Sequence, residues 1–265
     1  MRFGLSIPNM GEPGALVALA AEAEQAGWDG VFLWDHLHFI KGAGVHTQDP
    51  WVLLGAIAQC TERVRLGTLV TPVARRRPWK LAKEVLTLDW LSGGRAVLGV
   101  GLGEPGKDEF ADFGDPGDAR LRAELLDEGL DIVAKVWTGE AFIHDGKHYK
   151  VDAELPGRPA QQPRPPIWVA GQWPNKAPFR RAARWDGVVP IDVVTSGPIT
   201  PDRLAECLAF MGDLPPDYDV VATAMEDVQP AEYADAGATW LVESCWPVGD
   251  WLPDLRARVL AGPSR

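Results

Sequence analysis

Residues 27–38 decide the fold, and they read Gly27-Trp28-Asp29-Gly30-Val31-Phe32-Leu33-Trp34-Asp35-His36-Leu37-His38. Gly27 is expected to end a helix, because glycine enters the left-handed conformation without the steric cost of a Cβ. Val31 to Trp34 then form a short apolar strand, which is typical of a parallel sheet covered on both faces. Ligands bind beyond the carboxyl ends of the strands in such sheets, so Asp35, His36 and His38 become candidate site residues.

Strand and helix patterns alternate eight times along the chain. The expected strands span residues 3–7, 31–34, 64–70, 96–100, 167–170, 187–190, 220–224 and 239–243. The expected helices span residues 14–26, 51–60, 78–92, 118–138, 175–184, 201–211, 230–236 and 251–260. Eight such units fit a closed (β/α)8 barrel better than an open doubly wound sheet. We therefore predict an α/β fold, a single TIM barrel in one domain over residues 1–265.

One segment interrupts this alternation after the fourth helix. Phe142-Ile143-His144 and His148-Tyr149-Lys150 flank Asp145-Gly146, which is a strong signal for a two-strand turn. A proline-rich stretch follows over residues 156–166. We expect a small β-hairpin insertion over about residues 139–166 rather than a domain boundary.

The composition, 46% hydrophobic and 24% charged, is that of an ordinary soluble globular protein. The net charge of -11 argues against nucleic acids and anionic membranes as partners, because both bind basic surfaces. Cys60, Cys207 and Cys245 are far apart and odd in number, so we expect neither a disulfide framework nor a thiolate metal site. The sequence shows no signal-peptide core and no long apolar run, and we expect a cytoplasmic protein.

The segment Asp35-His36-Leu37-His38 has three interpretations. It is an ordinary loop after a strand, a His-x-His metal pair as in a metallohydrolase, or an acid/base histidine beside a carboxylate. The metal interpretation is weak, because catalytic zinc needs three protein ligands and His144 and His148 lie in the hairpin. We favour His36 as the acid/base group, oriented by Asp35, because imidazole titrates near neutral pH.

Two glycine-bearing segments end strands three and four at the same rim. They read Gly67-Thr68-Leu69-Val70-Thr71-Pro72 and Gly99-Val100-Gly101-Leu102-Gly103-Glu104. Because GxGxxG is absent, a phosphate fingerprint is a weak interpretation. The glycines indicate either close approach of the backbone to a flat ligand or a barrel strand thinned for packing. Glu104 stands where a second acid/base group would be useful.

Two further segments are candidates for holding an anion. Gly171-Gln172 follows strand five, and Asn175 and Lys176 follow at the start of a helix, where the helix dipole attracts phosphate. Arg75-Arg76-Arg77 precedes a helix that begins at Pro78, which is an unfavourable place for cations unless they meet an anion. In both segments the alternative is a solvated surface residue.

These residues together resemble the bacterial luciferase-like superfamily, the TIM-barrel oxidoreductases that use FMN or a deazaflavin coenzyme of the F420 type. The resemblance spans nearly the whole chain. Its most specific pieces, in order, are residues 27–36, 65–72, 91–103 and 180–187.

The resemblance implies a coenzyme ring across the barrel mouth over strands two to four, and a homodimer. It implies that His36 takes a substrate proton, that Glu104 is an acid, and that a non-proline cis peptide joins Leu69 to Val70. The chain departs from bacterial luciferase at Leu102, where luciferase has a phosphate-binding arginine. It also lacks the sequence for a long lid, so substrate sequestration would fall to residues 41–48 and 104–117.

We predict an oxidoreductase that passes a hydride between coenzyme F420, slightly favoured over FMN, and a small organic substrate. Alternatives are an FMN-dependent two-component monooxygenase, which needs oxygen and a flavin reductase partner, a non-catalytic flavin-binding barrel, and a metallohydrolase. The predicted catalytic residues are His36, Asp35 and Glu104, with no metal. The predicted coenzyme-binding residues are Thr68, Leu69, Val70, Thr71, Gly101, Gly103, Gly171, Gln172, Lys176 and Arg75.

Overall fold

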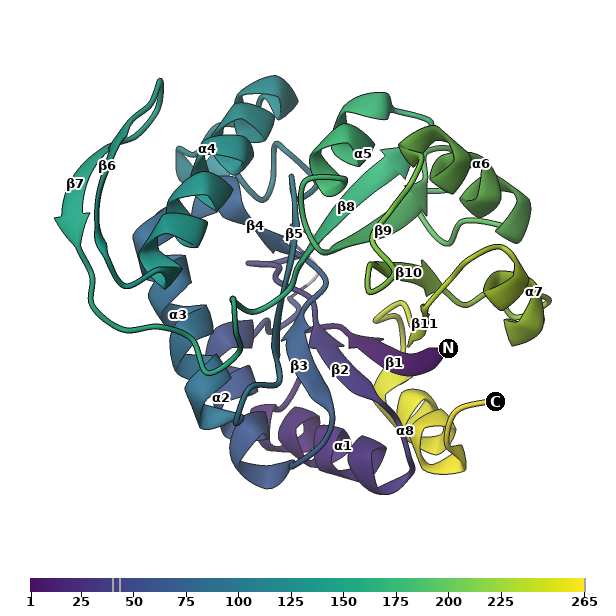
Figure 1. The fold of residues 1–265 in the computed structure, drawn as a ribbon. Coiled ribbons are helices and arrows are strands. Elements are labelled where there is room, and N and C mark those ends of the chain that lie inside the picture. Colours follow the sequence, from purple (N-terminus) through teal and green to yellow (C-terminus); the bar gives the residue numbers. More distant parts are fainter. Residues whose placement is uncertain (40, 43, 265) are drawn as a thin grey trace.

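β1 (Arg2–Ile7) pairs in parallel with both β2 (Gly30–Leu33) and β11 (Trp240–Ser244), and this joins the two ends of the chain in one sheet. The other strands are β3 (Arg65–Thr68), β4 (Thr71–Pro72), β5 (Ala96–Gly101), β8 (Ile167–Trp173), β9 (Gly187–Asp192) and β10 (Asp219–Thr223). A pairing between β3 and β5 closes the ring in this computed structural model, which describes residues 1–39, 41–42 and 44–264 (Figure 1). The predicted parallel (β/α)8 barrel is confirmed.

Helices surround the barrel on its outside (Figure 1). They are α1 (Pro13–Gln25), α2 (Pro50–Cys60), α3 (Pro78–Leu91), α4 (Ala119–Trp137), α5 (Lys176–Ala182), α6 (Pro201–Met211), α7 (Pro230–Asp235) and α8 (Trp251–Ala261), with short 3-10 turns η1 (Val73–Arg75) and η2 (Ala111–Phe113). The Asp49 carboxylate caps α2 as expected, accepting a hydrogen bond from the backbone N–H of Val52. No helix in the described residues has the length and apolarity that crossing a membrane requires.

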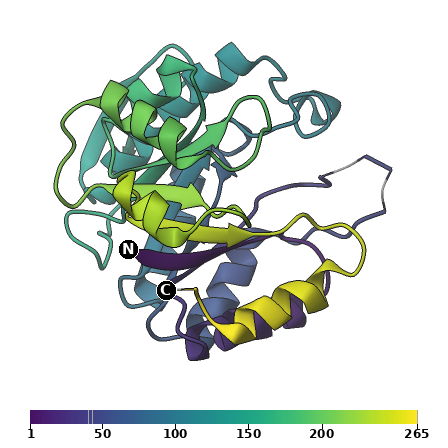
Figure 2. The same cartoon turned by 90° about the vertical axis from the view of Figure 1, so that its right-hand side faces the viewer.

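The two ends of the chain lie close together at one side of the barrel (Figure 2). α8 runs beside α1 in both views, and Arg256 of α8 forms an ion pair with Glu22 of α1. The last helix therefore completes the outer layer next to the first one.

The predicted hairpin insertion is present as β6 (Ala141–Asp145) and β7 (Lys150–Glu154), which pair antiparallel. It stands outside the barrel beside α4 (Figure 1). Glu128 of α4 accepts hydrogen bonds from the backbone N–H groups of Lys147, His148 and Tyr149 in the hairpin turn. The insertion is thus anchored to the outer helical layer, away from the carboxyl ends of the barrel strands.

The barrel interior is filled by aromatic and branched side chains. Phe32, Trp168 and Trp240 are fully buried and contact one another, with ring centroids 5.1 to 5.7 Å apart. The indole N–H groups of Trp168 and Trp240 both donate to the carboxylate of Asp219, so this inner cluster has its polar atoms paired. Trp168 and Trp240 therefore serve packing.

The third barrel strand differs from the sequence prediction. We expected one strand over residues 64–70, but the chain forms β3, then Leu69–Val70 with a cis peptide bond between them, then β4. The cis bond at this position is the one that the family resemblance implies. β5 crosses so close at this point that a Cβ on Gly99 would lie 2.0 Å from the carbonyl oxygen of Thr68.

Candidate active site

His36 follows β2 at the carboxyl end of the barrel and is held there from two sides. Its imidazole is 23% exposed, and Nδ1 lies 3.4 Å from Oε1 of Glu109. Its backbone N–H donates to Oδ1 of Asn9 at 3.3 Å, and its carbonyl accepts from Nδ2 of Asn9 at 2.9 Å. Nε2 of His36 has no hydrogen-bond partner within the described part of the chain. One ring nitrogen is therefore tied to a carboxylate and the other is free to exchange a proton.

Glu109, in the loop after β5, organises the segment that carries His36. Its side chain is 1% exposed and accepts hydrogen bonds from the backbone N–H groups of Leu37, His38 and Phe39. Burial by itself raises the pKa of Glu109, but the hydrogen bonds from His36 and these three N–H groups outweigh it and hold the pKa well below the ordinary value. Glu109 is therefore a buried, ionised hydrogen-bond acceptor.

Asp35 does not contact His36, although we expected it to orient the imidazole. Its buried carboxylate accepts hydrogen bonds from Arg75 at 3.1 Å, Arg76 at 2.8 Å and the hydroxyl of Thr71 at 3.1 Å. Arg75 also donates to Glu109 at 2.7 Å. Asp35 and Glu109 are thus joined through Arg75. The carboxylate that contacts the imidazole is Glu109 and not Asp35 as we expected, because Asp35 is paired with the two arginines.

Arg75 was also predicted to bind the coenzyme, and its contacts argue against that role. Its side chain is 7% exposed and carries ion pairs to both Asp35 and Glu109. A guanidinium that is paired with two buried carboxylates would have to leave them to bind a phosphate or an acidic tail, and breaking buried ion pairs is costly. The unfavourable place of this arginine run before α3 is explained by acids inside the protein.

Glu104 lies in the same loop as Glu109 but has a different partner. Its side chain is 65% exposed and accepts a hydrogen bond from Nη2 of Arg122 at 2.8 Å. Arg122 is 1% exposed, stacks over the ring of Phe110, and its Nε and Nη1 have no hydrogen-bond partner among the described residues. No described contact joins Glu104 to His36.

The predicted ring-binding residues divide into buried and accessible ones. Thr68 and Thr71 are buried. Their hydroxyls form hydrogen bonds with the carbonyl oxygen of Gly99, the carboxylate of Asp35 and each other. Leu69 and Val70 are half-buried and pack against the inner cluster. Leu69 and Val70 are therefore the members of this segment that a ligand at the barrel mouth could contact.

The glycines of this region are required by the protein's own packing. A Cβ on Gly101 would lie 2.8 Å from Cγ2 of Val70, and one on Gly103, where φ is +74°, would lie 2.7 Å from Phe110 and Pro72. A Cβ on Gly171 would lie 2.3 Å from Cβ of Pro178. Of the two interpretations of these glycines, the structure supports thinning for packing, and close approach to a ligand is not needed to explain them.

Gln172 lies in β8, which extends beyond the predicted strand, and Lys176 follows at the start of α5. Gln172 pairs in register with Ile191, which packs against the inner cluster, so its side chain belongs to the inward-facing set. Lys176 begins α5, and its ammonium lies 3.5 Å from the ring centroid of Trp173. Asn175 occupies the position before α5, but its side chain makes no capping hydrogen bond.

Side chains at the carboxyl end of the barrel interior are partly exposed, whereas those at its centre are buried. Ser6 pairs in register with Phe32 and with Ser244, so both serines face inward. The indole N–H of Trp34 donates to the hydroxyl of Ser6 at 2.9 Å. Trp34, Gln172 and Ser244 are half-buried, while Phe32 below them is fully buried. Bulky side chains fill the barrel at the level of Phe32, and the side chains above them keep partial exposure.

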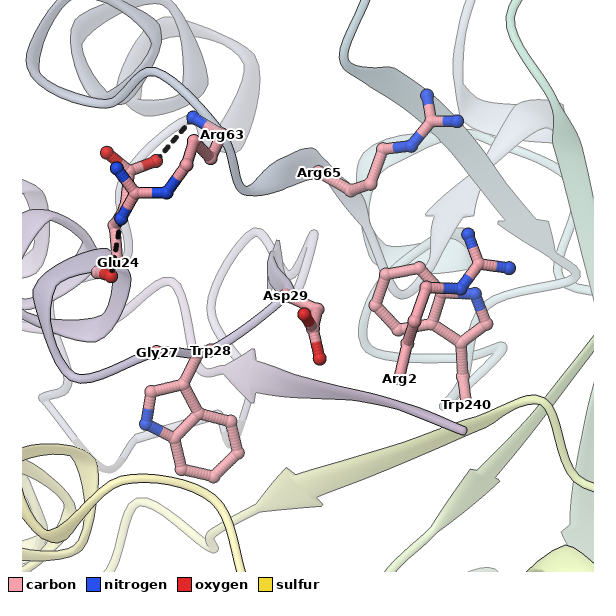
Figure 3. Close-up of a pocket in the computed structure, with 8 residues that line it drawn as sticks. All are labelled: Arg2, Glu24, Gly27, Trp28, Asp29, Arg63, Arg65 and Trp240. Carbon is pink, nitrogen blue, oxygen red and sulfur yellow. Dashed lines mark hydrogen bonds between the residues drawn. The ribbon is translucent and has the colours of Figure 1, made fainter. Parts of the chain in front are cut away.

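Two cavities lie at opposite ends of the barrel. One of about 500 Å³ is lined by His38 and by residues of the two loops that we expected to sequester substrate: Lys41, Gly42, Gly44, Val45, Asp112 and Phe113. The other, of about 330 Å³, lies where β1, β2, β3 and β11 begin, with Arg2, Arg65 and Trp240 together on one side and Glu24 hydrogen-bonded to Arg63 on the other (Figure 3). His36 belongs to the end that carries the first cavity.

The imidazoles of His38, His144 and His148 have protein partners. Nε2 of His38 lies 2.7 Å from the carbonyl oxygen of Asp108, and His144 and His148 of the hairpin contact Glu128 and Glu124. The described residues contain no group of three or more His, Cys, Asp or Glu side chains arranged to hold a metal ion.

The sequence did not single out Glu109, Arg122 or Trp246, which all stand at this end of the barrel. Glu109 lies among several acids in a charged loop, and nothing local marks it. The sequence carried a weak signal for Arg122, because it lies in the first turn of α4, where a cation is unfavourable.

Comparisons with known proteins agree with this fold. The family model described as luciferase-like monooxygenase matches residues 1–223. The F420-dependent glucose-6-phosphate dehydrogenase of Nakamurella multipartita is 36% identical over 178 residues, covering 66% of this chain and 51% of that protein. The chain therefore spans about half the length of the curated relatives it matches.

Two solved structures have the same fold over nearly the whole chain. The coenzyme F420-dependent tetrahydromethanopterin reductase from Methanopyrus kandleri superposes with a TM-score of 0.77 at 18% identity, covering 98% of this chain and 96% of that one. The monooxygenase RslO1 from Streptomyces bottropensis superposes with a TM-score of 0.70 at 26% identity, covering 98% and 79%. These likenesses show the fold, and the family match over residues 1–223 shows that the chain belongs to the luciferase-like monooxygenase family.

Proposed function

We propose that the protein is an oxidoreductase that transfers a hydride between a deazaflavin coenzyme of the F420 type and a small organic substrate. The observation that carries the proposal is the contact between Nδ1 of His36 and the buried carboxylate of Glu109 at the carboxyl end of the barrel. The similarity to an F420-dependent dehydrogenase supports the choice of coenzyme.

The described residues fit a planar coenzyme at this end. Leu69 and Val70 offer a half-buried apolar surface, and the inward-facing Ser6, Gln172 and Ser244 offer polar atoms to the edge of a ring. Gly171 of β8 and Lys176, the first residue of α5, would meet a phosphate. When bound there, a deazaflavin supplies hydride transfer.

The Glu109 contact determines which nitrogen of His36 acts as the base. Ionised Glu109 only accepts hydrogen bonds, so Nδ1 of His36 must carry the hydrogen between them. In the neutral imidazole, Nε2 then has the free lone pair. His36 would take the proton of a substrate hydroxyl at Nε2 during oxidation and return it during reduction, while Glu109 stabilises the cation that forms.

Asp35 and Glu104 have different parts in this proposal. Asp35 holds Arg75 and Arg76 in place, and through Arg75 it supports Glu109. Glu104 is proposed as the second acid, as the family resemblance implies. Glu104→Gln in the activity assay tests that role, because an acid that donates in the rate-limiting step should lower kcat about a hundredfold when lost.

Coenzyme titration of the purified protein tests the proposal. Oxidised F420 and FMN are titrated separately, and fluorescence is recorded. We expect saturable binding of F420, and F420 reduction when a substrate alcohol is added. Binding of FMN alone, with oxygen consumption when a flavin reductase is supplied, would instead support the monooxygenase alternative, which the similarity to RslO1 favours. Binding of neither would refute both.

We further propose that the enzyme works in the cytoplasm as a homodimer. Sedimentation velocity of the purified chain checks the assembly, and a single species at the mass of one chain would contradict it.

A further inference from the structure

An aromatic surface stands beside His36 at the rim, and the proposed mechanism does not use it. We define the aromatic wall as Trp34, Phe39 and Trp246. The three ring centroids are 5.7 to 5.9 Å apart, and the His36 ring lies 5.7 Å from Trp34 and 5.0 Å from Phe39. The wall therefore adjoins the imidazole directly.

The aromatic wall is accessible. Trp246 is 62% exposed, Val248 of the same segment is 73% exposed, and Leu37 of the segment that carries His36 is 43% exposed. Trp34 and Phe39 are half-buried. Single exposed apolar residues are ordinary, but several gathered around an acid/base group indicate a surface that binds an apolar ligand.

Phe39 occupies its place in a conformation that bulky residues avoid. Its φ is +60°, and its backbone N–H is held by Oε1 of Glu109 at 2.8 Å. Such a conformation costs on the order of 1 kcal/mol for a residue with a Cβ. Glu109 thus positions both the imidazole and one ring of the aromatic wall.

The side of the mouth near the wall offers no cation to an anionic substrate. The segments after β9, β10 and β11, residues 193–200, 224–229 and 245–250, contain no Lys or Arg, and the last two contain Glu226, Asp227 and Asp250. Arg75 and Arg76 are paired with Asp35, Glu109 and Glu84. In the loops across the mouth, Lys41 and Lys107 share the carboxylate of Asp112. Binding a phosphate group through any of these four cations would require breaking an ion pair.

We propose that the substrate is a neutral, largely apolar alcohol, or its ketone or aldehyde, whose hydrocarbon part packs on the aromatic wall. This inference rests on the proposed function. In oxidation, the carbinol carbon loses its hydrogen with the bonding electrons to oxidised deazaflavin, and the hydroxyl proton goes to Nε2 of His36. The products are the carbonyl compound and the reduced coenzyme. A sugar phosphate, the substrate in the name of one relative, does not match this surface.

The first test compares substrates in the F420-linked assay. We expect kcat/KM for 1-phenylethanol to exceed that for glucose 6-phosphate by at least about a hundredfold, equivalent to about 2.7 kcal/mol. A preference for glucose 6-phosphate overturns the inference, while leaving the coenzyme assignment intact.

The second test uses matched tryptophan variants. Trp246→Ala is expected to raise KM for 1-phenylethanol about tenfold and to leave kcat within about twofold. The indole contacts the substrate equally in the ground state and in the transition state, so its loss weakens binding without slowing the chemical step. Trp246→Phe should recover most of the affinity. The control is Trp90→Ala on α3, since Trp90 is also 62% exposed and its indole N–H reaches only the carbonyl of Arg158. Equal KM values in Trp246→Ala and Trp90→Ala overturn the inference.

A third measurement is independent of the coenzyme. Saturation-transfer NMR with acetophenone on the purified chain should give a signal that Trp246→Ala removes and Trp90→Ala keeps. If the chain bound no coenzyme, the proposed function would fail, and this signal would still decide whether the wall binds a neutral apolar ligand. An unchanged signal in Trp246→Ala contradicts it.

Discussion

Replacing His36 by asparagine should lower kcat for alcohol oxidation by about 10³-fold and leave the dissociation constant for F420 within about twofold. The rate falls because asparagine keeps the size and polarity of the side chain but has no lone pair that takes a proton near neutral pH. Coenzyme affinity holds because the residues proposed to contact the ring, Leu69 and Val70, are untouched. Steady-state kinetics and fluorescence titration on the same preparation measure both quantities.

The control for this variant is His148→Asn in the hairpin, whose imidazole contacts Glu124 outside the barrel. It should retain full activity. If His36→Asn kept kcat, or if it lost activity only by losing F420, the acid/base role would be wrong. If the unmodified protein bound F420 but neither oxidised an alcohol nor reduced a carbonyl compound, the non-catalytic alternative would be favoured.

Glu109→Gln should lower both stability and turnover. The variant leaves Arg75 short of one buried ion-pair partner and weakens four hydrogen bonds at once, so we expect the free energy of unfolding to fall by about 3 kcal/mol. The glutamine amide can also donate to Nδ1 of His36, which puts the imidazole hydrogen on Nε2 and removes the base. We therefore expect kcat to fall about a hundredfold. Urea unfolding and kinetics check the two parts.

The stability difference between the wild type and Glu109→Gln should depend on pH. Because the pKa of Glu109 is lowered by folding, its contribution is fully present above the ordinary value of 4.5 and is lost as the pH falls toward the folded value. The contribution of the Glu109 charge to this difference should shrink on acidification below about pH 5.5. The control is Asp108→Asn, whose carboxylate has only a surface contact with Lys107, and it should cost less than about 1 kcal/mol. Equal losses in the two variants would contradict the anchoring role of Glu109.

The barrel and the position of His36 could be predicted from local sequence. Periodic apolar residues and the capping residues Asp49 and Gly27 mark the elements, and the apolar run before Asp35 places His36 at a strand end. Such signals act over a few residues, so they carry information about where a strand stops and which residues come directly after it.

The partners of the site residues could not be predicted, because they are set by contacts between distant segments. Glu109 and the N–H of Leu37 are 72 positions apart, and the charge of Arg75 is met by two acids from different loops. Asp35 was assigned to His36 because it is adjacent in sequence, yet adjacent side chains after a strand point in different directions. Gly101 and Gly103 were ambiguous for the same reason, since Val70, Phe110 and Pro72 fill the space that a ligand was expected to fill.

The central claim is that a planar redox coenzyme binds at the carboxyl end of the barrel, against Leu69 and Val70. The most direct measurement is F420 titration of Val70→Phe beside Val52→Phe, since Val70 is half-buried at the mouth and Val52 is 73% exposed on α2. The account predicts at least about tenfold weaker F420 binding for Val70→Phe, and wild-type binding for Val52→Phe. Equal affinity in the two variants, with both folded by thermal unfolding, would contradict it.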